Sequence, residues 1–218
     1  MTSNLKLAKD YFIFDLDGTI SDPRIGMIRS INYSLDRYQF EQAREKDISA
    51  LIGLPLDEIY LKLCGEIEAS MLELLIAAYR ESYHIFGYRE NSLYEGIESS
   101  LNHLAQTAGG GLGICTSKPS AIAKKILKMF GLRNLFEFIS GGDVGVEKST
   151  QIAELLKKKA ISHNSIMIGD RFIDIRAAKA NEIRSVGVLW GYGSRLELEQ
   201  ESPNQLLSAP DEIKNLEI

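Results

Sequence analysis

The chain has 218 residues, of which 44% are hydrophobic and 25% are charged, a composition that is ordinary for a globular protein with a sizeable core. Its 25 basic and 30 acidic residues give a net charge of −5, which argues against a nucleic-acid-binding surface. We expect no membrane contacts, because no apolar run approaches the ~18 residues of a membrane-spanning helix. We also expect a cytoplasmic protein, because the only cysteines are Cys64 and Cys115, which are too few for a disulfide framework and suit a reducing compartment.

The first predicted element is a buried strand at residues 11–14, an apolar run rich in aromatic and β-branched side chains. Asp15 and Asp17 follow its carboxyl end, where open α/β sheets bind their ligands. These two carboxylates would repel each other unless a cation such as Mg²⁺ neutralised them. Asp15 could then be both nucleophile and metal ligand, and Asp17 could protonate a leaving group. Gly18 allows a tight turn, and Gly18 and the Thr19 hydroxyl are predicted to bind a phosphate, although the segment alone could be a surface turn.

Residues 20–92 are predicted to form an all-helical insertion between the first strand and the rest of the chain. Pro23 stands where a first helical turn would begin, and apolar residues recur at helical spacing most clearly over residues 69–86. The apolar stripe of that helix is typical of core packing. We therefore expect two domains, which are a core of residues 1–19 and 93–218 and a helical domain of residues 20–92.

From residue 96 onward the pattern changes to alternating helices and strands. The predicted helices are residues 97–108, 121–130, 152–160 and 173–181, and the predicted strands are residues 112–115, 136–140, 165–168 and 185–190. Strands separated by helices of this length predict right-handed βαβ units and a parallel sheet. The expected fold class is α/β, with a Rossmann-like parallel sheet core and an inserted all-helical domain.

Polar residues follow these strands, and the carboxyl ends of parallel strands share one edge of a sheet. Thr116 and Ser117 can donate hydrogen bonds to phosphoryl oxygens, and Lys148 can supply positive charge to a transferring group and to a nucleophilic carboxylate. Asp170 can point at a metal, and Asp174, one helical turn later, can be a second ligand or can orient the first. Each residue has an ordinary alternative, such as a helix cap or an exposed lysine, but the whole set in this order predicts a site.

Other kinds of site do not fit the sequence. Residues 142–149 lack the Gly that a P-loop requires where Glu147 stands. The glycine run before the second predicted strand lies on the wrong side of that strand for a dinucleotide-binding fingerprint. The histidines are His84, His103 and His163, and they lack the spacing of zinc ligands.

Taken together, the residues resemble the haloacid dehalogenase-like hydrolases over essentially the whole chain. FDLDGT at residues 14–19 looks like the first motif of that family, TSKP at residues 116–119 the second, Lys148 the third and GDRFID at residues 169–174 the fourth. The insertion is similar to the family's helical cap. Within the family, TSKP and GVLWGYGS at residues 187–194 look most like the phosphoglycolate phosphatase group and its nucleotidase-like neighbours.

This resemblance implies an activity as well as a fold. It implies that a carboxylate attacks phosphorus to give an aspartyl-phosphate, which water hydrolyses, and that Mg²⁺ is bound by Asp15, the Asp17 backbone carbonyl and Asp170. The predicted function is Mg²⁺-dependent hydrolysis of a small phosphorylated metabolite, with phosphoglycolate as the first candidate. Nucleoside monophosphates and inorganic pyrophosphate are the next candidates. A sugar phosphomutase and a binding module without catalysis remain alternatives.

Overall fold

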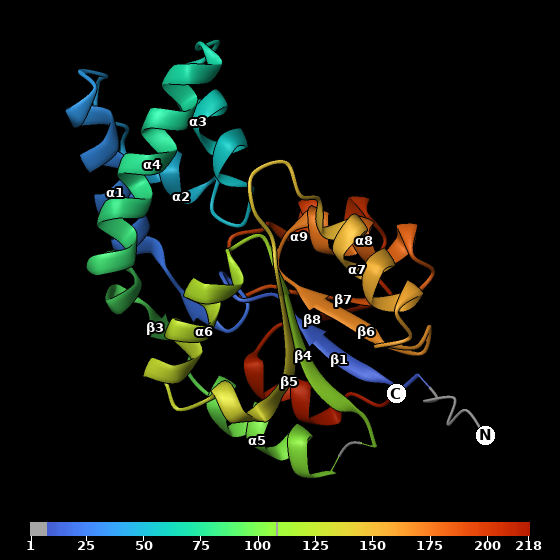
Figure 1. Cartoon of the computed structure of the whole chain (residues 1–218). Coiled ribbons are helices and arrows are strands. Elements are labelled where there is room, and N and C mark those ends of the chain that lie inside the picture. The colour runs from blue at the N-terminus through green and yellow to red at the C-terminus, as the bar shows by residue number, and fades with distance from the viewer. Residues whose placement is uncertain (1–7, 108) are drawn as a thin grey trace, which may run out of the picture.

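A six-stranded parallel sheet forms the centre of the protein, and helices cover both of its faces (Figure 1). The computed structural model describes residues 8–107 and 109–218. The strand β1 (Tyr11–Phe14) lies in the middle, between β4 (Gly111–Thr116) and β6 (Ile166–Gly169). Beyond β4 lies β5 (Phe136–Gly141), and beyond β6 lie β7 (Arg184–Val188) and β8 (Gln205–Leu207). These pairings are parallel, which confirms the predicted α/β fold.

Side chains of β1 point alternately to the two faces of the sheet, and helices pack on both faces. Phe12 and Phe14 belong to one buried cluster and Ile13 to another, because neighbouring residues of a strand point to opposite sides of the sheet. The first cluster includes residues of α5 (Ile97–Thr107) and α6 (Ser120–Met129), and the second includes residues of α7 (Lys148–Lys157) and α8 (Phe172–Ala180). Strand β1 is buried throughout, as is usual for a strand in a parallel sheet.

The helical insertion lies beyond one end of the sheet, at the upper left of Figure 1. Its helices are α1 (Arg24–Arg37), α2 (Glu45–Ser49), α3 (Leu56–Cys64) and α4 (Ala69–Ile85), followed by the short helix η1 (Gly87–Glu90). The chain enters and leaves the insertion through β2 (Ser21–Asp22) and β3 (Ser92–Leu93), which pair antiparallel. Apolar residues of the insertion share a buried cluster with residues of the sheet, so the two parts pack directly against each other.

Several element bounds differ from the prediction. The helix predicted at residues 152–160 is wrong in its bounds, because α7 begins at Lys148 and ends at Lys157. Its first turn carries buried polar side chains, Lys148 and Gln151, which the apolar pattern does not reveal. The short elements β2, β3, β8, η2 (Arg133–Leu135), α9 (Arg195–Gln200) and η3 (Pro210–Asn215) were not predicted. Residue 108, at the end of the helix predicted at residues 97–108, lies outside the described residues.

None of the helices in the described part of the chain is both long enough and apolar enough to cross a lipid bilayer.

Candidate active site

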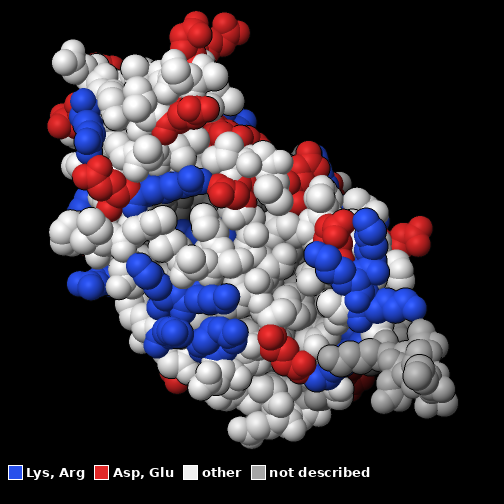
Figure 2. Space-filling view, in the orientation of Figure 1, with Lys and Arg blue, Asp and Glu red and all other residues white. Residues whose placement is uncertain are grey.

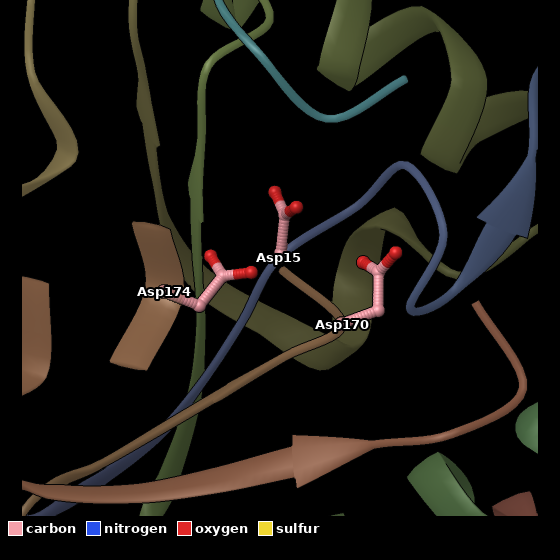
Figure 3. A group of neighbouring side chains, drawn as sticks. All are labelled: Asp15, Asp170 and Asp174. Atoms are coloured by element: carbon pink, nitrogen blue, oxygen red, sulfur yellow. The ribbon is translucent and has the colours of Figure 1, made fainter. Parts of the chain in front are cut away.

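The carboxyl edge of the sheet brings together residues that are far apart in the sequence. Asp15 follows β1, Thr116 ends β4 and Asp170 follows β6, and these three strands are neighbours. Figure 3 shows the side chains of Asp15, Asp170 and Asp174 beside one another. Each offers a carboxylate oxygen, and these oxygens lie within 4.8 Å of one another. The shared edge of parallel strands thus gathers the predicted carboxylates in one place.

The three carboxylates are almost fully buried, which makes their charged forms costly without a cation. Asp170 and Asp174 have no exposed surface, and Asp15 is 2% exposed. Burial raises the pKa of Asp170 well above its usual range, and the charges of Asp15 and Asp174 raise it further. Burial also raises the pKa of Asp174, although Lys148 opposes this shift. Three close oxygen ligands that repel one another fit a hard divalent cation.

Neighbouring groups hold the carboxylate of Asp170 in place. The Thr19 hydroxyl donates to Asp170 Oδ1 at 3.0 Å, and the backbone N–H of Tyr192 donates to Oδ2 at 2.8 Å. Gly18 has a φ of 89°, and a Cβ atom at this position would lie 2.2 Å from Asp170 Oδ2, so the turn requires glycine. In this structure Gly18 and Thr19 face Asp170, and their predicted contacts with a phosphate stay predictions.

Lys148 is a buried cation between two of the carboxylates. Its Nζ lies 3.1 Å from Asp15 Oδ1 and donates a hydrogen bond to Asp174 Oδ1. The contact with Asp15 is an ion pair without hydrogen-bond alignment, because Asp15 Oδ1 has no hydrogen-bond partner among the described residues. Burial opposes the charged ammonium, but Asp15 and Asp174 outweigh it and raise the pKa of Lys148. The predicted nucleophile therefore lies beside a fixed positive charge.

Asp174 has hydrogen-bond partners on both oxygens. Oδ1 accepts from Lys148, and Oδ2 accepts from the backbone N–H of Arg171 at 3.0 Å. This arrangement favours the orienting role that the sequence offered as an alternative for Asp174. Its predicted contact with the metal stays a prediction.

The two oxygens of Asp17 have different surroundings. Oδ2 lies 2.9 Å from the Nζ of Lys118, whereas Oδ1 is buried and has no hydrogen-bond partner within the described ranges. Burial raises the pKa of Asp17, and Lys118 acts against this shift. Asp17 is not one of the three carboxylates whose oxygens lie within 4.8 Å of one another, and the metal ligand that the family resemblance implies at this position is the backbone carbonyl. That ligand stays a prediction.

Lys118 is a residue of the site to which the sequence analysis gave no role. It is 8% exposed, and besides Asp17 it contacts Tyr83 of α4, donating to the hydroxyl at 3.2 Å and lying 4.3 Å from the ring centroid. Burial opposes its charge, but Asp17 together with Tyr83 and Tyr79 outweighs burial and raises the pKa of Lys118. Its place in TSKP, two residues after Thr116, was the available signal.

A pocket of about 60 Å³ lies between the sheet edge and the helical insertion. The sheet side contributes Asp15, Asp17, Thr116, Ser117, Lys118 and neighbouring residues, and the insertion contributes Leu54, Ile59, Tyr79, Arg80, Tyr83, His84 and others. Asp170, Asp174 and Lys148 are not part of this lining. A ligand bound in this pocket would therefore contact both the sheet edge and the insertion.

Polar contacts join the insertion to the sheet around the pocket. Arg171, next to Asp170, donates to the backbone carbonyls of Ala50 and Ile52. Ser117 donates to the carbonyl of Gly53 at 3.4 Å. These contacts hold the loop between α2 and α3 against residues that follow β4 and β6, beside the predicted site.

Basic side chains gather near this region despite the negative net charge of the chain. On the face shown in Figure 2, Lys and Arg side chains cluster over α6, a helix that carries Lys124, Lys125 and Lys128. Helix α6 follows directly on Pro119, which lines the pocket. A local positive field of this kind attracts anionic ligands even to an acidic protein.

Comparison with known proteins agrees with this geometry. The family model described as haloacid dehalogenase-like hydrolase matches residues 12–188. A 5'-nucleotidase from Pseudomonas aeruginosa is 33% identical over 195 residues, covering 88% of this chain and 87% of that protein. A phosphoglycolate phosphatase from Colwellia psychrerythraea is 30% identical over 227 residues, covering 94% and 95%.

The fold of the chain also resembles that of a solved structure. The crystal structure of a predicted phosphatase from Clostridium acetobutylicum superposes with a TM-score of 0.88 at 31% identity, covering 95% of this chain and 97% of that one. The family match extends from β1 through the insertion to the end of β7. On these grounds the chain belongs to the haloacid dehalogenase-like hydrolases.

Proposed function

We propose that the chain is a Mg²⁺-dependent phosphatase that hydrolyses a small phosphomonoester through an aspartyl-phosphate on Asp15. The observation that carries the proposal is the pair of carboxylates at the end of β1. Asp15 lies beside the ammonium of Lys148, and Asp17 faces the same pocket with one oxygen free of hydrogen bonds among the described residues. These contacts support Asp15 as the nucleophile and Asp17 as the acid at one opening. Phosphoglycolate is the first candidate substrate, because of the TSKP segment and the similarity to the phosphatase of Colwellia psychrerythraea.

The metal would be held by Asp15, the backbone carbonyl of Asp17 and Asp170. These carboxylates fit the ion because they are buried and their oxygens lie close together. When bound, Mg²⁺ supplies positive charge that offsets the negative charge of the phosphoryl group. Asp174 orients Lys148 and the start of α8 through its two hydrogen bonds.

The residues of the chain carry the proton and phosphoryl transfers. Asp15 attacks phosphorus and forms the P–O bond of the aspartyl-phosphate, while the bond to the substrate alcohol breaks and the alcohol oxygen takes a proton from Asp17. The ionised Asp17 then takes a proton from a water molecule, which attacks the aspartyl-phosphate and releases inorganic phosphate and the Asp15 carboxylate. Lys148, Thr116 and Ser117 supply charge and hydrogen bonds to the phosphoryl oxygens.

The helical insertion, residues 20–92, acts in this proposal as a cap domain over a core of residues 1–19 and 93–218. Its support is the pocket, which is lined from both parts and has a volume of about 60 Å³. Opening of the cap admits the substrate and closure excludes water, which strengthens the charged contacts within the site. A folded phosphoprotein would be too large to enter beneath the cap.

A nucleoside monophosphate is the second candidate substrate, and one feature of the pocket favours it. Tyr79 and Tyr83 line the pocket and stack on each other, with ring centroids 5.2 Å apart and planes 12° apart. Aromatic rings can stack on a nucleobase, but the Lys118 ammonium lies over the Tyr83 ring and both rings are buried, so a nucleobase would reach them only when the insertion moves away from the sheet. A preference for a mononucleotide over phosphoglycolate in a direct comparison would select this candidate.

The experiment is a phosphate-release assay on a panel of phosphorylated metabolites, with Mg²⁺ and with a chelator. We expect release from one or a few small esters, dependence on Mg²⁺, and complete loss of turnover in Asp15→Asn. The matched control is Asp36→Asn, which makes the same chemical change at an exposed position of α1 and should keep full activity. Turnover that persists in Asp15→Asn, or that is unchanged in excess chelator, would contradict the proposal.

A further inference from the structure

A buried polar network connects Asp17 to the helical insertion. Lys118, which follows β4, lies 2.9 Å from Asp17 Oδ2 and donates to the Tyr83 hydroxyl of α4 at 3.2 Å. The same hydroxyl accepts a hydrogen bond from Asn91 Nδ2 at 3.0 Å, and the Oδ1 of Asn91 accepts from Ser21 at 3.2 Å. Ser21 is in β2 and Asn91 directly precedes β3, so the network ends at the two chain crossings between sheet and insertion.

The interior position of Lys118 calls for a reason beyond stability. Lys118, Asp17 and Tyr83 are 8%, 8% and 1% exposed. Removing both charges of an ion pair from water costs free energy that the pairing repays only in part, and apolar residues of similar volume would often be more stable there. An apolar pair of similar volume could therefore stabilise the fold about as well as this ion pair does.

The ion pair determines which oxygen of Asp17 is available to a substrate in the pocket. Lys118 occupies Oδ2 of Asp17, which leaves Oδ1 as the oxygen without a hydrogen-bond partner in the described part of the chain. A carboxylate held at one oxygen can present only the other to a substrate, and proton transfer needs that oxygen within hydrogen-bond reach of the leaving group.

We propose that Lys118 is a positioning residue that fixes the Asp17 carboxylate so that Oδ1 meets the leaving-group oxygen, and that Tyr83 holds Lys118 in this position when the insertion lies over the sheet. The inference rests on the proposed function, in which Asp17 is the acid. Tyr83 is on the insertion and Lys118 is on the sheet side, so movement of the insertion away from the sheet would break their contact. Closure and orientation of the acid are thereby linked.

The test compares two classes of substrate in the Lys118→Met variant. An alkyl phosphate needs a proton on its leaving oxygen, whereas 4-nitrophenyl phosphate releases a stable anion without one. Since general acid catalysis contributes roughly 10²–10⁴-fold, we expect kcat on the alkyl phosphate to fall about 10- to 100-fold and kcat on 4-nitrophenyl phosphate to change much less. The control is Lys179→Met, which removes an exposed lysine of α8 and should leave both rates unchanged.

A second variant, Tyr83→Phe, keeps the ring over the ammonium and removes only the hydroxyl. We expect a smaller loss in the same direction, again larger for the alkyl phosphate. This variant is also the safeguard if Lys118→Met fails to fold, because a phenylalanine fills nearly the same space. Equal losses on both substrates in Tyr83→Phe or in a folded Lys118→Met would overturn the inference.

Asp17→Asn separates failure of this inference from failure of the proposed function. If Asp17 is the acid, Asp17→Asn alone loses far more activity on the alkyl phosphate than on 4-nitrophenyl phosphate, and adding Lys118→Met causes no further selective loss. Selective loss in Asp17→Asn but not in Lys118→Met refutes the positioning role only. No selective loss in Asp17→Asn refutes the acid role on which the inference rests.

Discussion

Replacing Gly18 by alanine should disturb the site through Asp170. Gly18 has a φ of 89°, and a Cβ atom there would meet Asp170 Oδ2 at 2.2 Å. The left-handed backbone costs an alanine about 1–2 kcal/mol. The clash moves a carboxylate that accepts hydrogen bonds from Thr19 and Tyr192, and a bond to a charged group is worth about 1.5–3 kcal/mol. Strain plus one lost bond predicts a loss of about 2.5–5 kcal/mol in the free energy of unfolding.

Gly131→Ala is the matched control for this prediction. Gly131 has a φ of 73°, and a Cβ atom there would have nothing within 4 Å, so only the backbone strain of about 1–2 kcal/mol applies. Urea unfolding measures both losses, and calorimetric titration with Mg²⁺ should show affinity about 10–100-fold weaker in Gly18→Ala but unchanged in Gly131→Ala. Equal unfolding free energies and equal metal affinities in the two variants would refute the reasoning.

Three further predictions concern charges at and near the site. Lys148→Met leaves Asp15 and Asp174 buried without their cation, and urea unfolding should show a loss of about 3–5 kcal/mol. Burial raises the pKa of Asp174 from 3.8 to about 6. The folded state then binds the Asp174 proton more tightly than the unfolded state, so the melting temperature in chelator should fall as the pH rises from 3.8 to about 6. Above this pH range, adding Mg²⁺ should restore the melting temperature. Arg80 pairs with Asp143 at a partly exposed position, so Arg80→Ala should cost less than about 1 kcal/mol in the same unfolding assay.

The sequence predicted strands and site residues correctly where a local apolar pattern is followed directly by residues of the expected chemistry. The apolar run before Asp15 predicted β1, and parallel strands placed Asp15 and Asp170 at one edge. The sequence did not predict that the Thr19 hydroxyl would donate to Asp170, because the direction of a hydroxyl depends on the loop packed against it. The contact between Lys118 and Tyr83 was missed for a similar reason, since Tyr83 belongs to a distant helix and no local spacing indicates that the two residues meet. Strand β8, with Gln205 and two leucines, is too short to show a pattern.

The central position of β1 has a consequence for how the chain folds. Tyr11 pairs with Gly111 and Phe12 with Ile166, so the partners of β1 come much later in the chain and emerge from the ribosome after it. Until then an apolar strand with two unpaired edges is exposed, a state that favours association with other chains. Asp10 and Asp15 stand at its two ends, and charges beside an apolar strand suppress such association. Asp15 would therefore protect the nascent chain before any substrate can reach it.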